Sequence, residues 1–221
     1  MVKLSLRLQT IHDMVPQSVV ADVGADHGKL MIALFESGRI NRGYAIENKK
    51  GPYNRLVEAL ADNQLDDVIV PLLSDGIEDL PSIVSTVVIA GMGGETIVSI
   101  LKKHPEKLKN VDTIIVDPHG EVPLVRQEIS NLGYAIAEEK MIKDEDVYYE
   151  IIKFIKSDIA FYSEKDLEFG PILSHEKSAT FKEKYQSRIN EIDNLLNSNH
   201  KLPESRVAEL NNEKAKLIGV I

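Results

Sequence analysis

The segment VVADVGADHG, residues 19–28, places an apolar run directly before a turn that contains glycine. A strand that enters a glycine turn and continues into a helix is a common start of nucleotide-binding α/β folds. The dinucleotide fingerprint G-x-G-x-x-G requires glycine at the second and fifth positions after Gly24, but this chain has Asp26 and Lys29 there. The segment therefore predicts an α/β fold while departing from the pattern that binds a pyrophosphate.

The residues that flank this segment predict an alternation of strands and helices. β-Branched runs such as TVVIAG and TIIVDP are typical of strands in a parallel sheet that helices cover on both faces. An amphipathic helix over residues 4–15, which Pro16 ends, is expected before the first strand. The expected strands are 18–23, 43–47, 68–73, 86–90 and 112–117, and the expected helices are 28–38, 51–63, 93–103 and 121–132.

The pattern changes after the fifth strand. The segments AIAEEKMIK (135–143) and VYYEIIKFI (147–155) are separated by three residues, which predicts a β-hairpin. The sheet would then have seven strands, mostly parallel, with one antiparallel strand. Apolar residues at helical spacing over 181–196 and 207–217, with Pro203 between them, predict a helical hairpin that resembles a short coiled coil. We therefore expect an α/β domain over residues 1–157 and a helical domain over 158–221.

Composition argues against several classes of protein. Of the 221 residues, 43% are hydrophobic and 28% are charged, which is ordinary for a soluble globular protein. The chain has no cysteine, and its histidines show no metal-ligand spacing with acidic residues, so we expect no disulfide and no metal. It shows no signal-peptide core or membrane span, which predicts a cytoplasmic protein. A net charge of −9 argues against indiscriminate nucleic-acid binding and favours a selective partner met by local basic patches.

The acidic residue in the first turn indicates which cofactor this fold would bind. The carboxylate of Asp26 would repel a pyrophosphate, but it would attract an ammonium or a sulfonium group. S-adenosylmethionine carries both cations and no phosphate, so the turn suits this cofactor better than NAD. The alternative is that Asp26 only caps the following helix, because Asp is a favoured N-cap residue.

Three further strand ends carry candidate ligand groups. Glu47 ends the second expected strand, where an acidic residue typically accepts hydrogen bonds from ribose hydroxyls. Asp75 in SDG would reach an adenine edge, and the glycines of AGMGG (90–94) would let the backbone approach a planar ligand. Each signal has an alternative. Glu47 could be a solvated charge, SDG could be an ordinary turn, and AGMGG could be a tight strand-to-helix connection. Open α/β sheets bind ligands at this edge, so together these strand ends favour a cofactor site.

The fifth expected strand ends in DPHG (117–120), beside AGMGG. Asp117, Pro118 and His119 are candidates for binding a second substrate, although a lone histidine is more often structural or solvent-facing than catalytic. No P-loop and no G-x-S-x-G motif is present, so the sequence supports neither a kinase nor a hydrolase.

Several motifs together resemble those of the TrmK family over nearly the whole chain. They are SLRL (5–8), DVGADH (22–27), GP (51–52), AGMGG (90–94), YYEII (148–152) and FGPIL (169–173). This family consists of bacterial methyltransferases that modify N1 of adenine 22 in tRNA with S-adenosylmethionine. The resemblance implies a Rossmann-like class I methyltransferase fold and a tRNA partner that the C-terminal helices hold. We expect the protein to be a monomer.

The resemblance also implies which residues form the site. The cofactor would be bound by Arg7, Asp22, Gly24, Asp26, His27, Glu47, Asp75, Gly76, Ala90, Gly91 and Met92, with Arg7 on the methionine carboxylate or on a tRNA phosphate. The target base would be bound by Lys29, Met92, Gly93, Asp117, Pro118 and His119. Lys29 stands where the family usually has tyrosine, and DPH stands where it often has Q-P-N. Both departures fall in the expected base pocket.

The implied reaction requires little acid–base chemistry. N1 of adenine carries a free lone pair at neutral pH, so catalysis would consist mainly of positioning N1 against the methyl group in a dry cleft. The carboxylate of Asp26, the expected catalytic residue, or that of Asp117 would stabilise the positive charge that develops on the base. The base must first be unstacked. A NAD-dependent oxidoreductase with the same fold and a non-catalytic α/β scaffold are the alternatives.

Overall fold

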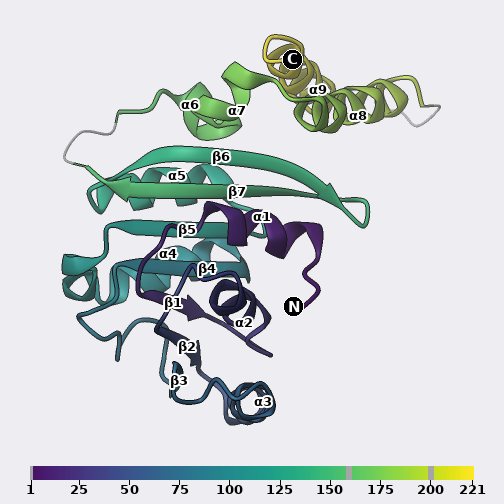
Figure 1. The fold of residues 1–221 in the computed structure, drawn as a ribbon. Coiled ribbons are helices and arrows are strands. Elements are labelled where there is room, and N and C mark those ends of the chain that lie inside the picture. Colours follow the sequence, from purple (N-terminus) through teal and green to yellow (C-terminus); the bar gives the residue numbers. More distant parts are fainter. Residues whose placement is uncertain (1, 158–160, 199–201) are drawn as a thin grey trace.

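The computed structural model describes residues 2–157, 161–198 and 202–221. Its centre is a seven-stranded sheet in the order β3-β2-β1-β4-β5-β7-β6 (Figure 1). The first five strands are parallel, and β7 is antiparallel to both of its neighbours, as expected. The strands are β1 (Val20–Val23), β2 (Gly43–Glu47), β3 (Ile69–Leu73), β4 (Thr86–Met92), β5 (Thr113–Pro118), β6 (Tyr134–Asp144) and β7 (Val147–Lys156).

Helices cover both faces of this sheet, because successive residues of each central strand point to opposite sides. Val87 and Ile89 of β4 pack against α4 and α5, whereas Val88 packs in the cluster that α1, α2 and α3 complete. Figure 1 shows α1 in front of the sheet and α4 and α5 behind it. These helices are α1 (Leu6–Met14), α2 (Lys29–Glu36), α3 (Lys50–Asp62), α4 (Gly94–Lys103) and α5 (Val122–Asn131), and a 3₁₀ helix, η1 (Pro105–Asn110), follows α4.

The C-terminal part forms a third apolar cluster of its own. Phe181, Tyr185, Ile189 and Ile192 of α8 are buried against α9, and Met141 of β6 joins the same cluster. The helical hairpin lies beyond the outer strands β6 and β7 (Figure 1). The hairpin consists of α8 (Ala179–Leu196) and α9 (Glu204–Ile218), and two short helices precede it, α6 (Glu164–Phe169) and α7 (Pro171–Glu176). The short helices α6 and α7 were not expected from the sequence.

Three charged side chains are buried where the α/β part meets the C-terminal helices. The guanidinium of Arg126 on α5 donates to Glu139 on β6 at 2.8 Å and to Glu150 on β7 at 2.7 Å. The side chains of Arg126 and Glu139 are 0% exposed, and that of Glu150 is 5% exposed. Although burial acts in the other direction, Lys184 and Arg126 hold the pKa of Glu150 below its ordinary value. We call Arg126, Glu139 and Glu150 the buried ion cluster.

The C-terminal helices supply most of the remaining partners of this cluster. A Cβ atom on Gly170, between α6 and α7, would lie 2.7 Å from both Arg126 and Glu139, so only glycine fits there without a shift. The two parts are therefore joined by satisfied polar groups as well as by apolar contact. The partners from the C-terminal helices are as follows. The Leu167 carbonyl accepts from Arg126 at 2.9 Å, and the amides of Ile172 and Leu173 donate to Glu139 at 2.9 and 3.3 Å. The ammonium of Lys184 donates to Glu150 at 2.6 Å.

The expected strands and helices are confirmed, with shifts of a few residues at their ends. The expected division into residues 1–157 and 158–221 stays a prediction, and residues 158–160, at the expected boundary, lie outside the described part of the chain. Among the helices of the described ranges, none is both long enough and apolar enough to cross a membrane.

Candidate active site

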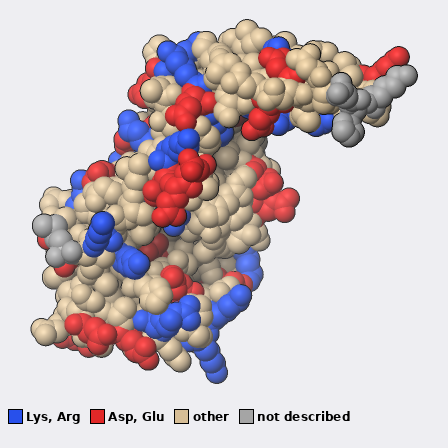
Figure 2. Space-filling model, turned by 90° about the vertical axis from the view of Figure 1, so that its right-hand side faces the viewer, with Lys and Arg blue, Asp and Glu red and all other residues tan. Residues whose placement is uncertain are grey.

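The parallel strands β1 to β5 end at a single edge of the sheet, on the right in Figure 1. The segments that the sequence singled out follow these ends, since carboxyl ends of parallel strands share one edge. Figure 2 shows the molecule from this side, and basic and acidic side chains are interspersed over it. Neither charge forms a continuous surface on this face, so a charged ligand is met by local groups.

The turn after β1 is fixed to the end of β2 by three hydrogen bonds from its backbone amides. Gly24 has φ +81° and Asp26 has φ +46°, so the chain takes left-handed conformations at both residues. The amides of Gly24 and Ala25 donate to the Ile46 carbonyl at 2.9 and 3.3 Å, and the amide of Asp26 donates to Oε1 of Glu47 at 2.6 Å. Glu47 therefore holds the turn in place as well as facing the cleft.

Asp26 does not cap helix α2, so the capping alternative is wrong. The N-cap residue is Gly28, which has no side chain to accept a hydrogen bond. The Asp26 carboxylate instead lies 3.3 Å from Nη2 of Arg55 and 3.7 Å from Nε2 of His27, and its side chain is 59% exposed. Asp26 is thus a charged group at the rim of the site, with two exposed basic side chains beside it.

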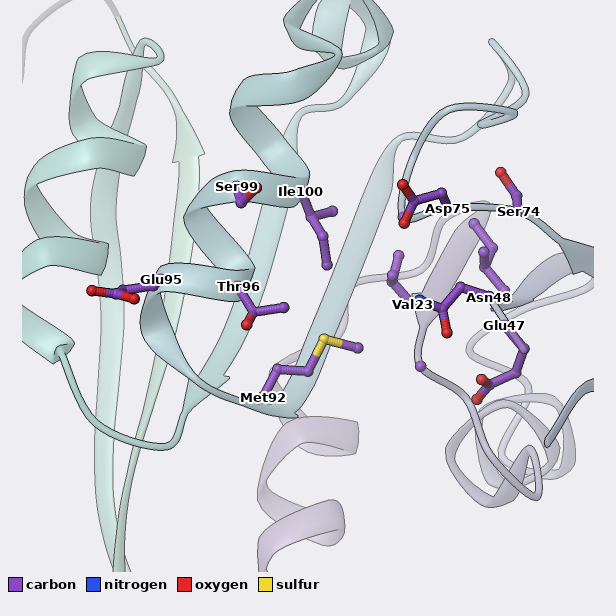
Figure 3. A pocket seen from close by; sticks show the side chains of 13 residues that line it. Val23, Glu47, Asn48, Ser74, Asp75, Met92, Glu95, Thr96, Ser99 and Ile100 are labelled. Atoms are coloured by element: carbon purple, nitrogen blue, oxygen red, sulfur yellow. The ribbon is translucent and has the colours of Figure 1, made fainter. Parts of the chain in front are cut away.

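A hollow of about 360 Å³ lies between β1, β2 and β3 on one side and α4 on the other. Figure 3 shows Thr96 and Ile100 of α4 facing Asn48 and Asp75 across it, with Met92 at one end. Asp75 is also paired with Lys103 at 2.7 Å, and this contact lowers the pKa of its carboxyl. The lining residues are Val23, Gly24, Ile46, Glu47, Asn48, Ser74, Asp75, Gly76, Met92, Glu95, Thr96, Ser99 and Ile100.

A second hollow of about 200 Å³ adjoins the first, and Gly24 lines both. Asp22, from inside β1, lies in it and is 5% exposed. Burial, together with the nearby carboxylate of Glu47, raises the pKa of Asp22 to about 7, although Arg7 acts in the opposite direction. A cationic ligand next to Asp22 would stabilise the ionised carboxylate, which burial disfavours, so this hollow suits a cation. The lining residues are Arg7, Leu8, Asp22, Gly24, Ala25, Asp26, His27, Lys29, Leu30 and Ala90.

Arg7 is held at the wall of this second hollow. Its Nη1 donates to Oδ2 of Asp117 at 2.5 Å, and its guanidinium lies 5.6 Å from the ring centre of Tyr149. Asp117 is fully buried, and its other oxygen, Oδ1, has no hydrogen-bond partner in the described residues. In the structure this carboxylate holds Arg7, and a place for Asp117 in the base pocket stays a prediction.

The AGMGG turn leads from β4 into α4 and contacts the end of β5. Met92 lies opposite Pro118 in the sheet register, and its carbonyl accepts from the amide of His119 at 2.8 Å. A Cβ atom on Gly94 would lie 2.7 Å from the Gly120 carbonyl, so this glycine allows close packing of the two loops. The AGMGG and DPHG segments thus pack against each other. From the sequence, we expected only that they would be neighbours at the ends of adjacent strands.

The chain matches the model of a protein family along most of its length. Residues 20–218 match the family model described as TrmK, tRNA (adenine(22)-N(1))-methyltransferase. The chain belongs to the TrmK family. The match includes the turn after β1, AGMGG and the C-terminal helices, so the family resemblance of the sequence motifs is confirmed.

Individual TrmK relatives agree along their whole length. The tRNA (adenine(22)-N(1))-methyltransferase of Bacillus subtilis is 27% identical over 97% of this chain and 92% of its own length. The structure of Sp1610 from Streptococcus pneumoniae, described as a candidate tRNA (m1A22) methyltransferase and bound to S-adenosyl-L-methionine, has 30% identity and TM-score 0.88, covering 99% of both chains. M. capricolum TrmK with S-adenosyl-homocysteine has 25% identity and TM-score 0.85, covering 98% and 96%. These likenesses confirm the Rossmann-like class I methyltransferase fold.

The candidate site contains residues that were not expected from the sequence. The polar side chains of Asn48 and Thr96 line the first hollow. Beside the second hollow, the Arg7 guanidinium lies over the ring of Tyr149. Asn48 directly follows Glu47, so its position next to an expected strand end was an available signal. Of the expected residues, Gly91, Gly93, Asp117, Pro118 and His119 are not among the lining residues of either hollow.

Proposed function

We infer that this chain is an S-adenosylmethionine-dependent methyltransferase that forms 1-methyladenosine at position 22 of tRNA. Its membership of the TrmK family supports this reaction. The observation that carries the inference is the pair of adjoining hollows at the carboxyl edge, which hold acidic side chains and meet at Gly24. A ligand with a nucleoside at one end and a cationic amino acid at the other fits them. NAD fits less well, because Asp26 and Asp22 would face its pyrophosphate.

We assign the first hollow to the nucleoside half of the cofactor and the second to the methionine half. In the first, Glu47 accepts from the ribose hydroxyls, and Asp75 and Gly76 lie by the base. In the second, Asp22 faces the ammonium group and Arg7 faces the carboxylate. Gly24, His27, Ala90, Gly91 and Met92 complete the cofactor residues, with Asp26 at the rim.

In catalysis, this chain binds the reacting groups, orients them and excludes water from them. When bound, the cofactor would supply an electrophilic methyl group on its sulfonium sulfur. In-line transfer of this group to the free lone pair of adenine N1 would break the carbon–sulfur bond and leave S-adenosyl-homocysteine. Met92 and Gly93 support the base at the end of β4, with Lys29, Pro118 and His119 around it. The Asp26 carboxylate, at the rim of the site, contributes to stabilising the positive charge that the base acquires, because opposite charges attract. No general base is needed.

The C-terminal helices are proposed as the platform for the body of the tRNA, with residues 1–157 as the catalytic domain and 158–221 as the tRNA-binding domain. Support comes from basic side chains on α8, such as Lys182, and from the joint at the buried ion cluster, which fixes the hairpin relative to the site. A cytoplasmic monomer is the proposed working form.

Methylation of undermodified tRNA tests this function directly. The purified protein is incubated with tRNA and S-adenosylmethionine that carries a labelled methyl group, and the modified nucleoside and its position are mapped. We expect 1-methyladenosine at position 22 alone. Calorimetry with NAD and with S-adenosylmethionine separates the alternatives, because an oxidoreductase would bind the first and a scaffold would bind neither.

The affinity for the cofactor is expected to depend on pH through Asp22. Its pKa is about 7 in the folded protein against 3.8 ordinarily, so the ligand-free protein loses stability as pH rises from 3.8 to about 7. A cationic ligand reverses the preference, and binding below pH 7 expels a proton. The dissociation constant should therefore fall on the order of tenfold for each pH unit towards 7 and then level off.

Asp22→Asn removes this titration and should flatten the profile, which calorimetry in buffers of different ionisation enthalpy checks directly. Asp66→Asn, at an exposed position after α3, is the matched control and should keep the wild-type profile. A wild-type dissociation constant that does not change between pH 5 and 8 would show that Asp22 does not face the cation.

Glu47→Ala is expected to weaken cofactor binding by about 2 kcal/mol, since hydrogen bonds to a charged group are lost. The substitution also removes the acceptor for the Asp26 amide and loosens the turn after β1. Calorimetry of S-adenosylmethionine binding measures the loss, and Glu58→Ala on the exposed side of α3 serves as the control. An unchanged dissociation constant in a folded Glu47→Ala protein would remove this residue from the site.

A further inference from the structure

A third cavity, of about 530 Å³, lies between the end of β5, the start of β7 and helix α8. It shares no lining residue with either hollow of the cofactor site. Because Lys184 of α8 forms part of its wall, the cavity is complete only when the C-terminal helices are in place. The lining residues are Pro118, His119, Gly120, Val122, Val147, Tyr148, Tyr149, Glu150 and Lys184.

The walls of this cavity are chiefly aromatic and apolar. The rings of His119 and Tyr149 lie 5.9 Å apart at an angle of 55°, and Tyr148 provides a third ring. The Tyr148 hydroxyl donates to Glu183 at 3.1 Å, and the ammonium of Lys143 lies 5.4 Å from the ring centre, so this ring is held in position. Such surfaces suit a flat ligand that stacks.

The charges in the cavity are already neutralised. Lys184 is paired with Glu150 at 2.6 Å, and Glu150 also accepts from Arg126. A free nucleotide or phosphate would have to compete with these contacts for the lysine. A heterocyclic base needs no such exchange, because stacking on aromatic side chains does not depend on charge.

The cavity begins one strand away from the cofactor site. Pro118 pairs with Met92, which lines the first hollow, and the His119 amide donates to the Met92 carbonyl. Neighbouring strands lie about 4.8 Å apart. On the other side, Tyr149 lies under the guanidinium of Arg7, which lines the second hollow. A nucleotide next to a base that lies at Met92 would therefore be close to the cavity.

We propose that this cavity receives the base of a nucleotide that adjoins the target adenine in the tRNA strand. The inference rests on the proposed function and assigns a second base-binding site to it. The target adenine itself must lie by the cofactor hollows, next to Met92, so Pro118 and His119 lie between the target base and the cavity that they also line. Enzymes that act on an unstacked base set part of their selectivity through the flanking nucleotides.

The test is a double-mutant cycle between a side chain of the cavity and a base of the tRNA. tRNAs are made with an abasic nucleotide on one or the other side of adenine 22, and their dissociation constants are measured with wild-type protein and with Tyr148→Ala. For one flank, we expect the wild type to lose about tenfold on removal of the base. Tyr148→Ala should bind intact tRNA about tenfold more weakly and lose nothing further on the abasic tRNA.

The controls separate stacking from structure. Tyr148→Phe keeps the ring, loses the hydrogen bond to Glu183 and should retain the coupling. Ile83→Ala removes an apolar side chain that is 54% exposed and lies before the start of β4, away from the carboxyl edge, and it should bind as wild type. Tyr148→Leu, which keeps an apolar side chain without the ring, replaces Tyr148→Ala in the same cycle should that protein not fold. Additive losses at both flanks would overturn this inference alone. Absence of methylation at adenine 22 by the wild type would overturn the proposed function and this inference with it.

Discussion

Arg126→Met is expected to lower the free energy of unfolding by about 3–5 kcal/mol, the range for removing one member of a buried charged group. Glu139 would keep only backbone donors from α7, and Glu150 would keep only Lys184. Methionine fills most of the volume but leaves both carboxylates without their central cation. Denaturant unfolding measures the loss, and the C-terminal helices should become sensitive to protease before the rest of the chain does.

The surface pair of Arg188 with Glu213 is the matched control for this prediction. Arg188 on α8 forms a two-bond contact with Glu213 at 2.7 and 3.1 Å, but both side chains are more than a third exposed. Arg188→Met should therefore cost no more than about 1 kcal/mol. Equal losses for the two variants would mean that burial adds nothing to the ion cluster.

Gly94→Ala is expected to lower the free energy of unfolding by about 3 kcal/mol. It should also reduce the rate of methyl transfer by the protein that remains folded. The new Cβ would lie 2.7 Å from the Gly120 carbonyl and 3.0 Å from both Glu121 and Val125, and a backbone carbonyl has little freedom to move. The AGMGG and DPHG segments must separate, and this displaces Met92 at the end of the first hollow. Thermal unfolding and kcat/KM on tRNA together measure the effect.

The preceding glycine provides the comparison. Gly93 has φ −60°, and a Cβ atom there would meet only the Thr96 hydroxyl, at 3.9 Å. Gly93→Ala should therefore keep the stability of the wild type within about 0.5 kcal/mol. If both alanine variants are as stable as the wild type, the packing of the two loops does not require Gly94.

The strand and helix pattern was accessible from the sequence because local signals agree with the final fold. The β-branched runs of β4 and β5 are buried on both faces, and their alternate residues enter the two apolar clusters. Helices α6 and α7 were not accessible in this way. They are six residues each, and their position depends on distant partners, namely Arg126 and Glu139, that no local pattern reveals.

The candidate site was predicted as far as its residues sit at strand ends. Glu47, Asp75 and Gly24 line one hollow because parallel strands bring their carboxyl ends together. The contact of Arg7 with Asp117 joins residues more than a hundred positions apart, so only the fold brings them together. The raised pKa of Asp22 likewise depends on burial by several elements.

The place of Glu139 in the chain also bears on how the protein is made. This carboxylate is buried against Arg126, yet two of its hydrogen-bond donors, the amides of Ile172 and Leu173, follow it by more than thirty residues. Synthesis proceeds at about 5–20 residues per second, so for some seconds of synthesis this acid lacks its protein donors and must remain hydrated. Strands β6 and β7 therefore reach their final environment only after α7 has left the ribosome, so the outer edge of the sheet becomes native later than the strands that precede it in the chain.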